Sequence, residues 1–239
     1  MSAMGSRERM LGRLRAANPS APAPVEQLDG RIDEHYDGRR ARASNAQLVR
    51  AMQAALTASH AEVWCAEAAA WPAQLAEKLA AHGVLRLLLD PASAEGAALA
   101  RALPAGVEAL PFARPLEHWK GELFDSVDAG FTVARSGIAA TGTLVLAPDR
   151  GSPRSASLVP PLHVALVHAD TLHADLHAAA RAERWADGMP SNLVLASGPS
   201  KTSDIQQTLA YGAHGPRWMW VIIVVAPAAQ AAAATGPAA

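Results

Sequence analysis

The chain has 239 residues, half of them hydrophobic, which suits one large α/β domain or one such domain with a helical extension. Its 21 basic and 22 acidic residues give a net charge of −1 without a basic stripe, so no nucleic-acid partner is predicted. No stretch approaches about 18 uncharged apolar residues and the amino terminus is charged, so we predict neither a membrane span nor a secretory signal and expect a cytoplasmic protein.

The first 43 residues are predicted to form an extension of the main domain. Residues 6–17 place their apolar side chains on one side of a short amphipathic helix. Residues 18–24 (NPSAPAP) have the composition of a linker, and residues 25–43 are polar with few core candidates. We therefore expect a helix, a linker and a loose surface arm ahead of a domain that spans residues 44–225.

That domain begins with a helix that Ser44 caps and that runs to about Ser59. Strands and helices alternate after it, which argues for a mainly parallel sheet. The predicted strands cover residues 62–66, 84–89 and 107–110, and the predicted helices cover residues 71–82 and 94–103.

The single cysteine, Cys65, falls in the first of these strands. One thiol cannot form an internal disulfide and cannot hold an iron–sulfur cluster, which needs about four protein ligands. Because the surrounding residues are typical of a buried strand, we expect a core cysteine. No cofactor is predicted in this chain.

The middle of the sequence has a different pattern. Residues 128–134 and 141–147 are strand-like and are separated by a short turn that contains Gly137. That connection is too short for a helical crossover, so we predict an antiparallel pair. The following segments are predicted as a loop, a strand, a helix and, after the last strand, a disordered tail: residues 149–157, 162–168, 171–185 and 226–239.

The last part of the domain is predicted to be a strand–loop–helix–turn–strand unit. The apolar runs at residues 192–196 and 218–225 are typical of strands buried on both faces of a parallel sheet. A helix is predicted over residues 202–211, because Ser203 and Gln206 have the spacing of a capping box and Gly212 follows the last turn.

The loop before that predicted helix is the first candidate site. Backbone N–H groups at a helix start, together with the charge of Lys201, can hold a phosphate or a carboxylate. The alternative is an ordinary capped helix start shaped by glycine and proline. The loop lacks the G-x-x-x-x-G-K-[ST] pattern, so nucleotide hydrolysis is not predicted. The residues expected to bind the anion are Gly198, Pro199, Ser200, Lys201 and Thr202.

Two blocks carry a family resemblance. Residues 198–205 (GPSKTSDI) precede Gly-Ala-His-Gly-Pro at 212–216, and residues 137–146 (GIAATGTLVL) precede Pro-Pro-Leu-His-Val at 160–164. Together they resemble the lactate utilization protein C family (LUD domain) over about residues 127–225. The resemblance implies a three-layer α/β/α fold similar to the ribose-phosphate isomerase and CoA-transferase superfamily, with ligands at the carboxyl ends of the strands.

The resemblance also implies a component of an L-lactate oxidation system in which partner proteins carry the iron–sulfur clusters and this chain binds a small anionic ligand. The alternatives are a stand-alone isomerase, acyl transferase or cyclo-ligase acting on a phosphorylated or CoA-like substrate, and a non-catalytic scaffold subunit. Ala140 stands where the family usually has an acidic residue, which removes the obvious carboxylate nucleophile. Catalytic residues, enzymatic activity and a possible homo-oligomer stay open.

The second candidate site is Thr141, Gly142 and Thr143. Two hydroxyl groups beside a glycine let the backbone approach a ligand closely, although a glycine bulge followed by strand-forming threonines gives the same pattern. The superfamily fold that the resemblance implies would place this segment near the same strand ends as the Lys201 loop, so we expect the two to share a pocket.

Three further residues are possible site residues. His163, after two prolines, could orient a ligand or be an ordinary strand-end histidine, and Arg135 could line the pocket or pair with Asp128. His214 lies beyond the predicted helix, which would place it roughly 15 Å from Lys201, so a structural turn is preferred there.

Metal binding is not predicted. His173 and His177 have i, i+4 spacing on a predicted helix, with His168 ahead of them, but no H-E-x-x-H pattern is present and a solvated helix face is the preferred interpretation. Arg150 and Arg154 could add charge at a pocket mouth or be ordinary surface arginines.

Overall fold

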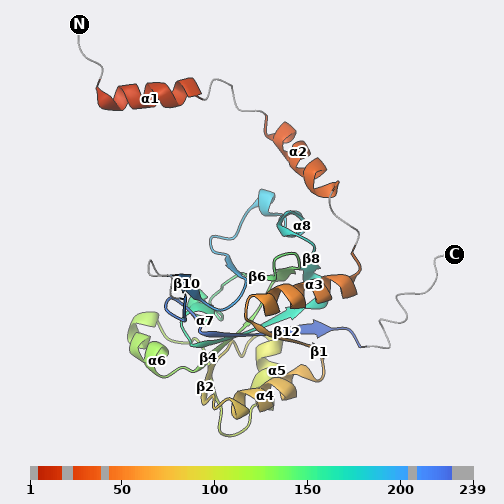
Figure 1. The fold of residues 1–239 in the computed structure, drawn as a ribbon. Helices are drawn as coiled ribbons and strands as arrows, with labels where there is room; N and C mark the ends of the chain where they lie inside the picture. The colour runs from red at the N-terminus through yellow and green to blue at the C-terminus, as the bar shows by residue number, and fades with distance from the viewer. Residues whose placement is uncertain (1–4, 18–23, 39–42, 204–208, 228–239) are drawn as a thin grey trace, which may run out of the picture. The chain divides into compact units, whose positions relative to one another are not determined.

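The computed structural model describes residues 5–17, 24–38, 43–203 and 209–227 (Figure 1). The chain divides into two compact units, residues 1–41 and 42–239. Most of the predicted linker and tail lies outside the described residues. None of the described helices is long and apolar enough to cross a membrane.

The first unit contains two helices, α1 (Ser6–Ala17) and α2 (Val25–Asp37), neither of which has a buried residue. α1 confirms the predicted amphipathic helix. The loose arm predicted after it is wrong, because α2 occupies most of that segment. Val25, Leu28 and Ile32 recur at helical spacing, and this periodicity outweighs the polar composition on which the prediction rested.

The second unit is built on a six-stranded sheet in which every pairing is parallel. This sheet confirms the predicted α/β class and its mostly parallel character. Its strands, in spatial order, are β1 (Glu62–Glu67), β12 (Trp218–Val225), β7 (Leu162–His168), β4 (Ala129–Val133), β2 (Arg86–Leu88) and β3 (Glu108–Leu110).

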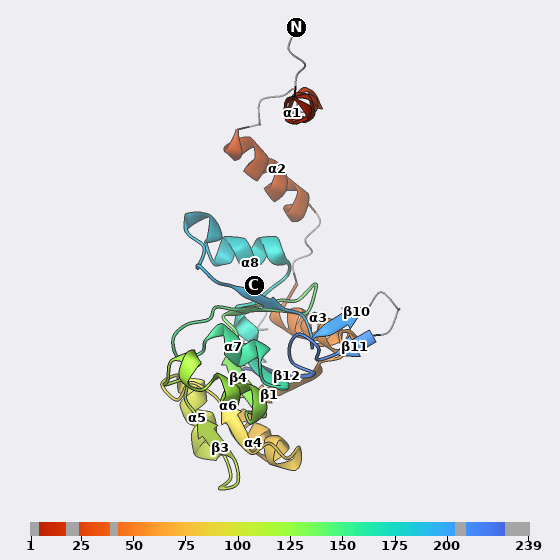
Figure 2. The same cartoon turned by 90° about the vertical axis from the view of Figure 1, so that its left-hand side faces the viewer.

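One face of this sheet is covered by α4 (Trp71–Ala81) and α5 (Ala94–Ala102) (Figures 1 and 2). Leu75 and Leu79 of α4 and Leu99 of α5 are fully buried against the sheet, in a cluster that includes Phe131 and Val164. Burial of this size stabilises the layer by roughly 2 kcal/mol per large side chain. Both helices fall where the sequence predicts them.

The opposite face carries α3 (Asn45–Ala58), which begins at a Ser44–Gln47 capping box, and a second sheet. Met52 and Leu56 of α3 pack with Val221 and Ile223 of β12 and with Leu144 of the second sheet. Helices therefore lie on both faces of the main sheet, as a three-layer fold requires. The second sheet has the order β8 (Leu172–His173), β5 (Ser136–Ile138), β6 (Thr143–Leu146) and β9 (Val194–Ala196).

Short helices complete this unit. α8 packs on the second sheet through Ala179, against Ile138 and Val145, and Leu123 of α6 and Ala156 of α7 share a cluster with Leu88. These elements are α6 (Lys120–Asp125), α7 (Arg154–Leu158), α8 (Leu176–Ala182) and the 3-10 turns η1 (Leu116–His118), η2 (Ala169–Thr171) and η3 (Trp185–Asp187).

The predicted antiparallel pairing in the middle of the chain is wrong. β4 pairs in parallel with β2 and β7, whereas β6 pairs antiparallel with β5 and β9. The segment read as a turn, Ser136–Ile138, is itself a strand, so the chain crosses from the main sheet to the second sheet after Val133. The predicted loop at 149–157 contains the start of α7, and the predicted helix at 171–185 is shortened to α8 behind β8.

The predicted helix at 202–211 is also wrong. Lys201–Ser203 (β10) and Leu209–Tyr211 (β11) form an antiparallel pair, and residues 204–208, including Gln206, lie outside the described residues. Pairing across the hairpin satisfies the backbone groups that a helix would otherwise bond internally. β9, predicted in a parallel sheet, is instead an antiparallel edge strand of the second sheet.

The expected core cysteine is exposed. Cys65 belongs to β1, which lies at the edge of the main sheet, so one side of the strand has no neighbouring strand in the described chain. Partial desolvation raises the pKa of the Cys65 thiol, which lowers its thiolate fraction at neutral pH.

Candidate functional site

The main sheet reverses its direction of winding between β2 and β4. The chain leaves β2 through α5 and reaches β3 at the sheet edge, whereas it leaves β4 through the second sheet and α7 and reaches β7 in the other direction. In open parallel sheets, ligands bind outside the carboxyl ends of the strands at such a switch point. The expected place for a site is therefore the end of β2 and β4.

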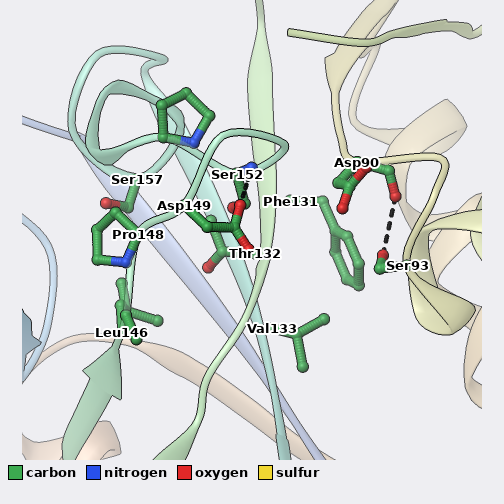
Figure 3. Close-up of a pocket in the computed structure, with 12 residues that line it drawn as sticks. Asp90, Ser93, Phe131, Thr132, Val133, Leu146, Pro148, Asp149, Ser152 and Ser157 are labelled. Carbon is green, nitrogen blue, oxygen red and sulfur yellow. Dashed lines mark hydrogen bonds between the residues drawn. The ribbon is translucent and has the colours of Figure 1, made fainter. Parts of the chain in front are cut away.

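A cavity of about 100 Å³ opens at that point (Figure 3). The pairing of β2 with β4 stops at Gly130, while β4 continues to Val133, so the last residues of β4 face the cavity. Phe131, Val133 and Leu146 supply apolar wall. The polar side chains of this strand-end pocket are Asp90, Ser93, Thr132, Asp149, Ser152 and Ser157.

A buried polar pair stands behind the strand-end pocket. Thr132 Oγ1 lies 2.8 Å from His163 Nε2, and the two residues are only 5% and 2% exposed. Desolvation lowers the pKa of His163 to about 4, so the ring is neutral at pH 7. His163 thus orients the Thr132 hydroxyl and does not itself reach a ligand or a partner loop.

The charged residues of the pocket are two carboxylates. Asp90 Oδ1 accepts a hydrogen bond from Ala92 N at 3.0 Å, and Asp149 Oδ1 accepts from Gly151 N at 2.9 Å and Ser152 N at 2.7 Å. A Cβ on Gly151 would lie 2.6 Å from the Asp90 carboxylate, so the two turns approach each other closely. Two carboxylates in the lining make the pocket unfavourable for an anion. Neither aspartate was predicted as a site residue, although Asp90 directly follows a predicted strand.

The two predicted binding segments meet at a different place. Thr143 Oγ1 lies 2.7 Å from Thr141 Oγ1 and 2.8 Å from Ser197 Oγ, which links the two segments by a chain of hydroxyl groups. Gly142, at φ +60°, packs so tightly on α3 that a Cβ would lie 2.6 Å from Leu56 N. A Cβ on Gly198 would lie 2.8 Å from Ser59 O. Both segments therefore surround the carboxyl end of α3.

A cleft of about 450 Å³ lies at this helix end. His60 and Lys201 are its basic residues, and Ser59 and Ser197 line it as well. The negative end of the α3 dipole favours nearby cations, so Lys201 can serve the helix end, an anion, or both. His60 adopts φ +67°, and its ring meets the ring of Tyr211 edge-on, with 5.7 Å between the two ring centroids. His60 was not predicted as a site residue. Its position just beyond a helix is the only local signal that could have indicated it.

The geometry predicted for the Lys201 loop is not the one observed. Ser200 N donates to Pro216 O at 2.8 Å and Ser200 O accepts from Gly212 N at 3.0 Å, so this backbone is bonded within a hairpin and does not form a helix start. The helix that was expected to separate Lys201 from His214 is replaced by the strands β10 and β11. The hairpin brings their turns together, and a Cβ on Gly215 would lie 3.1 Å from Ser200 Cβ. His214 is exposed and does not line the cleft.

The remaining candidates have structural partners. Arg135 Nε lies 3.4 Å from Glu183 Oε2, on the second sheet, and the alternative pair with Asp128 does not form. Asp128 instead accepts from Leu85 N and Arg86 N, both at 2.8 Å.

The two histidines considered for a metal do not share a helix, because His173 is in β8 and His177 is in α8. No group of three or more potential metal ligands occurs among the described residues. Arg150 and Arg154 are exposed and line neither pocket.

Residues 49–224 match the family model of the LUD domain. The chain belongs to the LUD domain family. A Neisseria meningitidis protein described as uncharacterized is 37% identical over 227 residues, which are 94% of this chain and 95% of that protein. A solved DUF162 family protein from Deinococcus radiodurans is 25% identical, covers 76% of this chain and 99% of its own, and superposes with a TM-score of 0.57.

Relatives named lactate utilization protein C match a shorter part of this LUD-domain protein. The Deinococcus radiodurans protein is 37% identical over 128 residues, which are 51% of this chain and 57% of the relative. The Shouchella clausii protein is 36% identical over 106 residues, which are 43% of this chain and 46% of the relative. The chain thus matches about half the length of these relatives. In this LUD domain, the strand-end pocket is acidic and the cleft at α3 is basic.

Proposed function

We propose that this LUD-domain protein takes part in the utilization of L-lactate, as the cluster-free component of a system that oxidises lactate to pyruvate. The similarity to proteins named lactate utilization protein C carries the proposal, at 36% and 37% identity within a shared LUD domain. Partner proteins would supply iron–sulfur clusters, because the one thiol of this chain cannot hold a cluster.

Growth of the source organism tests this role. A strain that lacks the gene is expected to fail on L-lactate as sole carbon source and to grow normally on pyruvate, with growth on lactate restored by the gene in trans. Equal growth of the deletion strain on both carbon sources would overturn the proposal. Recovery of cysteine-rich iron–sulfur proteins with the tagged protein from lactate-grown cells tests the partners separately.

Within that role, the cleft at α3 is the proposed site for a small carboxylate such as lactate or pyruvate. Its lining contains Lys201 and His60 and no carboxylate, and it also contains Ser197, whose hydroxyl is linked to the buried Thr143 hydroxyl. An anion in the cleft would accept charge-assisted hydrogen bonds from Lys201. The strand-end pocket is a poor alternative for the same ligand, because Asp90 and Asp149 line it.

The test of this site is Lys201→Ala, with binding of L-lactate and pyruvate followed by calorimetry. We expect binding to weaken about fivefold, because an exposed ion pair is worth roughly 1 kcal/mol. Lys120→Ala is the matched control, since Lys120 is an exposed lysine on α6 that does not line the cleft. Equal affinities of wild type and the Lys201 variant would reject the anion site. The proposed role in lactate utilization would then still be tested by the growth experiment.

A further inference from the structure

The strand-end pocket has an unusual distribution of charge for a cavity at a sheet switch point. Among its lining residues, Asp90 and Asp149 are charged and all others are neutral. Arg150 and Arg154 belong to the same loop region as Asp149, but both side chains are exposed and outside the lining. A ligand in the pocket therefore meets two negative charges without a lining cation.

Both carboxylates keep an Oδ2 that accepts no hydrogen bond from a described residue, although Asp90 Oδ2 lies close to Gly151. Asp90 and Asp149 bind turn N–H groups through Oδ1, and no described group donates to either Oδ2. Figure 3 shows the two side chains reaching the pocket from different segments, Asp90 from the β2–α5 connection and Asp149 from the loop after β6. An ionised carboxylate only accepts hydrogen bonds, so a ligand that fits this pocket must carry hydrogen-bond donors.

One lining hydroxyl group, that of Thr132, is held in place by a hydrogen bond. Thr132 is 5% exposed and its Oγ1 is 2.8 Å from Nε2 of the buried His163. Thr132 also lies in the part of β4 that continues beyond its pairing with β2. Ser157, 3% exposed, adds a second hydroxyl to the lining. Hydroxyl groups both donate and accept, so they match hydroxyl groups of a ligand.

We propose that the strand-end pocket is a second binding site, selective for a small amino alcohol, that is, a molecule with a protonated amine and neighbouring hydroxyl groups. The ammonium group donates to Asp90 and Asp149, and the hydroxyl groups bind at Thr132 and Ser157. The site does not take carboxylates, so its ligand differs in charge from the one assigned to the cleft.

Three probes of similar size test the charge selectivity on the full chain at pH 7: serinol (2-amino-1,3-propanediol) as the ammonium, glycerol as the neutral molecule and glycerate as the anion. Calorimetry is expected to show binding in that order, with serinol at least about tenfold tighter than glycerol and no binding of glycerate at this pocket. Because the cleft is proposed to take small carboxylates, glycerate is tested here by competition: displacement of serinol by glycerate, or no heat from serinol, would overturn the proposal.

Two isosteric variants locate the site. Asp149→Asn and Asp90→Asn keep an amide oxygen for the turn N–H groups and remove the charge. Each is expected to weaken serinol about fivefold and to change glycerol by less than about twofold. Glu77→Gln is the control, because it removes one charge from the exposed face of α4. Lys201→Ala should leave serinol binding unchanged. Unaltered serinol affinity in both aspartate variants, with circular dichroism confirming their fold, would reject the site.

Discussion

The strand-end pocket and the cleft at α3 are formed by different kinds of structural element. The pocket lies against the last residues of β4 and is backed by the buried Thr132–His163 pair, whereas the cleft lies between a helix end, a turn and a loop whose Lys201 is exposed. The pocket is acidic and the cleft is basic. The two proposed sites therefore differ in charge, and one is formed by the sheet whereas the other is formed by connections.

The difference has an energetic consequence. Side chains that are buried in a hydrogen-bonded pair contribute to the free energy of unfolding, because removal of one partner leaves the other desolvated. Exposed side chains such as Lys201 contribute little to stability and act on affinity. Changes behind the strand-end pocket should therefore lower stability, and changes at the surface of the cleft should lower binding alone.

The largest effect is expected at Gly142, which is buried against α3 and does not line the cleft. A Cβ there would lie 2.6 Å from Leu56 N, and its φ is +60°. Gly142→Ala should cost about 3 kcal/mol or more, from the left-handed backbone and from displacement of α3. Gly83→Ala is the matched control, because φ is +78° and no atom lies within 4 Å, so about 1 kcal/mol is expected. Urea unfolding measures both, and equal losses would show that α3 moves aside freely.

Near the cleft, the sequence predicted which segments matter but not why Gly142 is needed. The family resemblance predicted Thr141–Gly142–Thr143 beside the Lys201 loop, and a hydroxyl contact of Thr143 with Ser197 connects the two segments, although no residue of 141–143 lines the cleft. The reason for the glycine could not be predicted, because contact with Leu56 depends on the packing of a helix about 85 positions earlier in the chain. Hairpin strands in place of a helix at Lys201 were missed because the capping-box spacing and Gly212 favoured a helix, whereas β10 and β11 pair with each other.

The main sheet was easier to predict than the site it supports. β7 and β12 are continuous apolar runs whose buried positions dictate parallel strands, and both have the predicted bounds. The strand-end pocket depends instead on spatial order. Asp90 and Asp149 are about 60 positions apart, and they line one pocket because the loop after β6 packs against the turn after β2. A pattern along the chain does not contain that order.

The second effect in size is a pH dependence that His163 contributes. Its pKa is about 4 in the folded protein against 6.5 as the ordinary value, so the unfolded chain binds one more proton between these pH values. Stability from this group is fully present above pH 6.5 and is lost as the pH falls toward 4, by roughly 3 kcal/mol in total.

Comparison with His163→Gln separates the pH dependence of stability due to His163 from that due to the carboxylates. The amide keeps a polar partner for Thr132 and does not titrate, so the variant should lack the extra loss of stability on acidification. Urea unfolding at several pH values between 4 and 7 measures the difference. Parallel curves for wild type and variant would mean that His163 is accessible to protons in the folded protein, which contradicts a closed wall behind the strand-end pocket.

The smallest predicted effect tests whether the buried pair belongs to the pocket or only to the core. Thr132→Val keeps the shape of the side chain and leaves His163 Nε2 without its partner, so a loss of about 2 kcal/mol is expected. Thr132→Ser keeps the hydroxyl and should lose less, since only a methyl group is removed. If Thr132 lines a working site, the serine variant also retains serinol binding while the valine variant loses it. If both variants bind serinol equally, the pair stabilises β4 against β7 and has no part in recognition, and the strand-end pocket would then depend on its carboxylates alone.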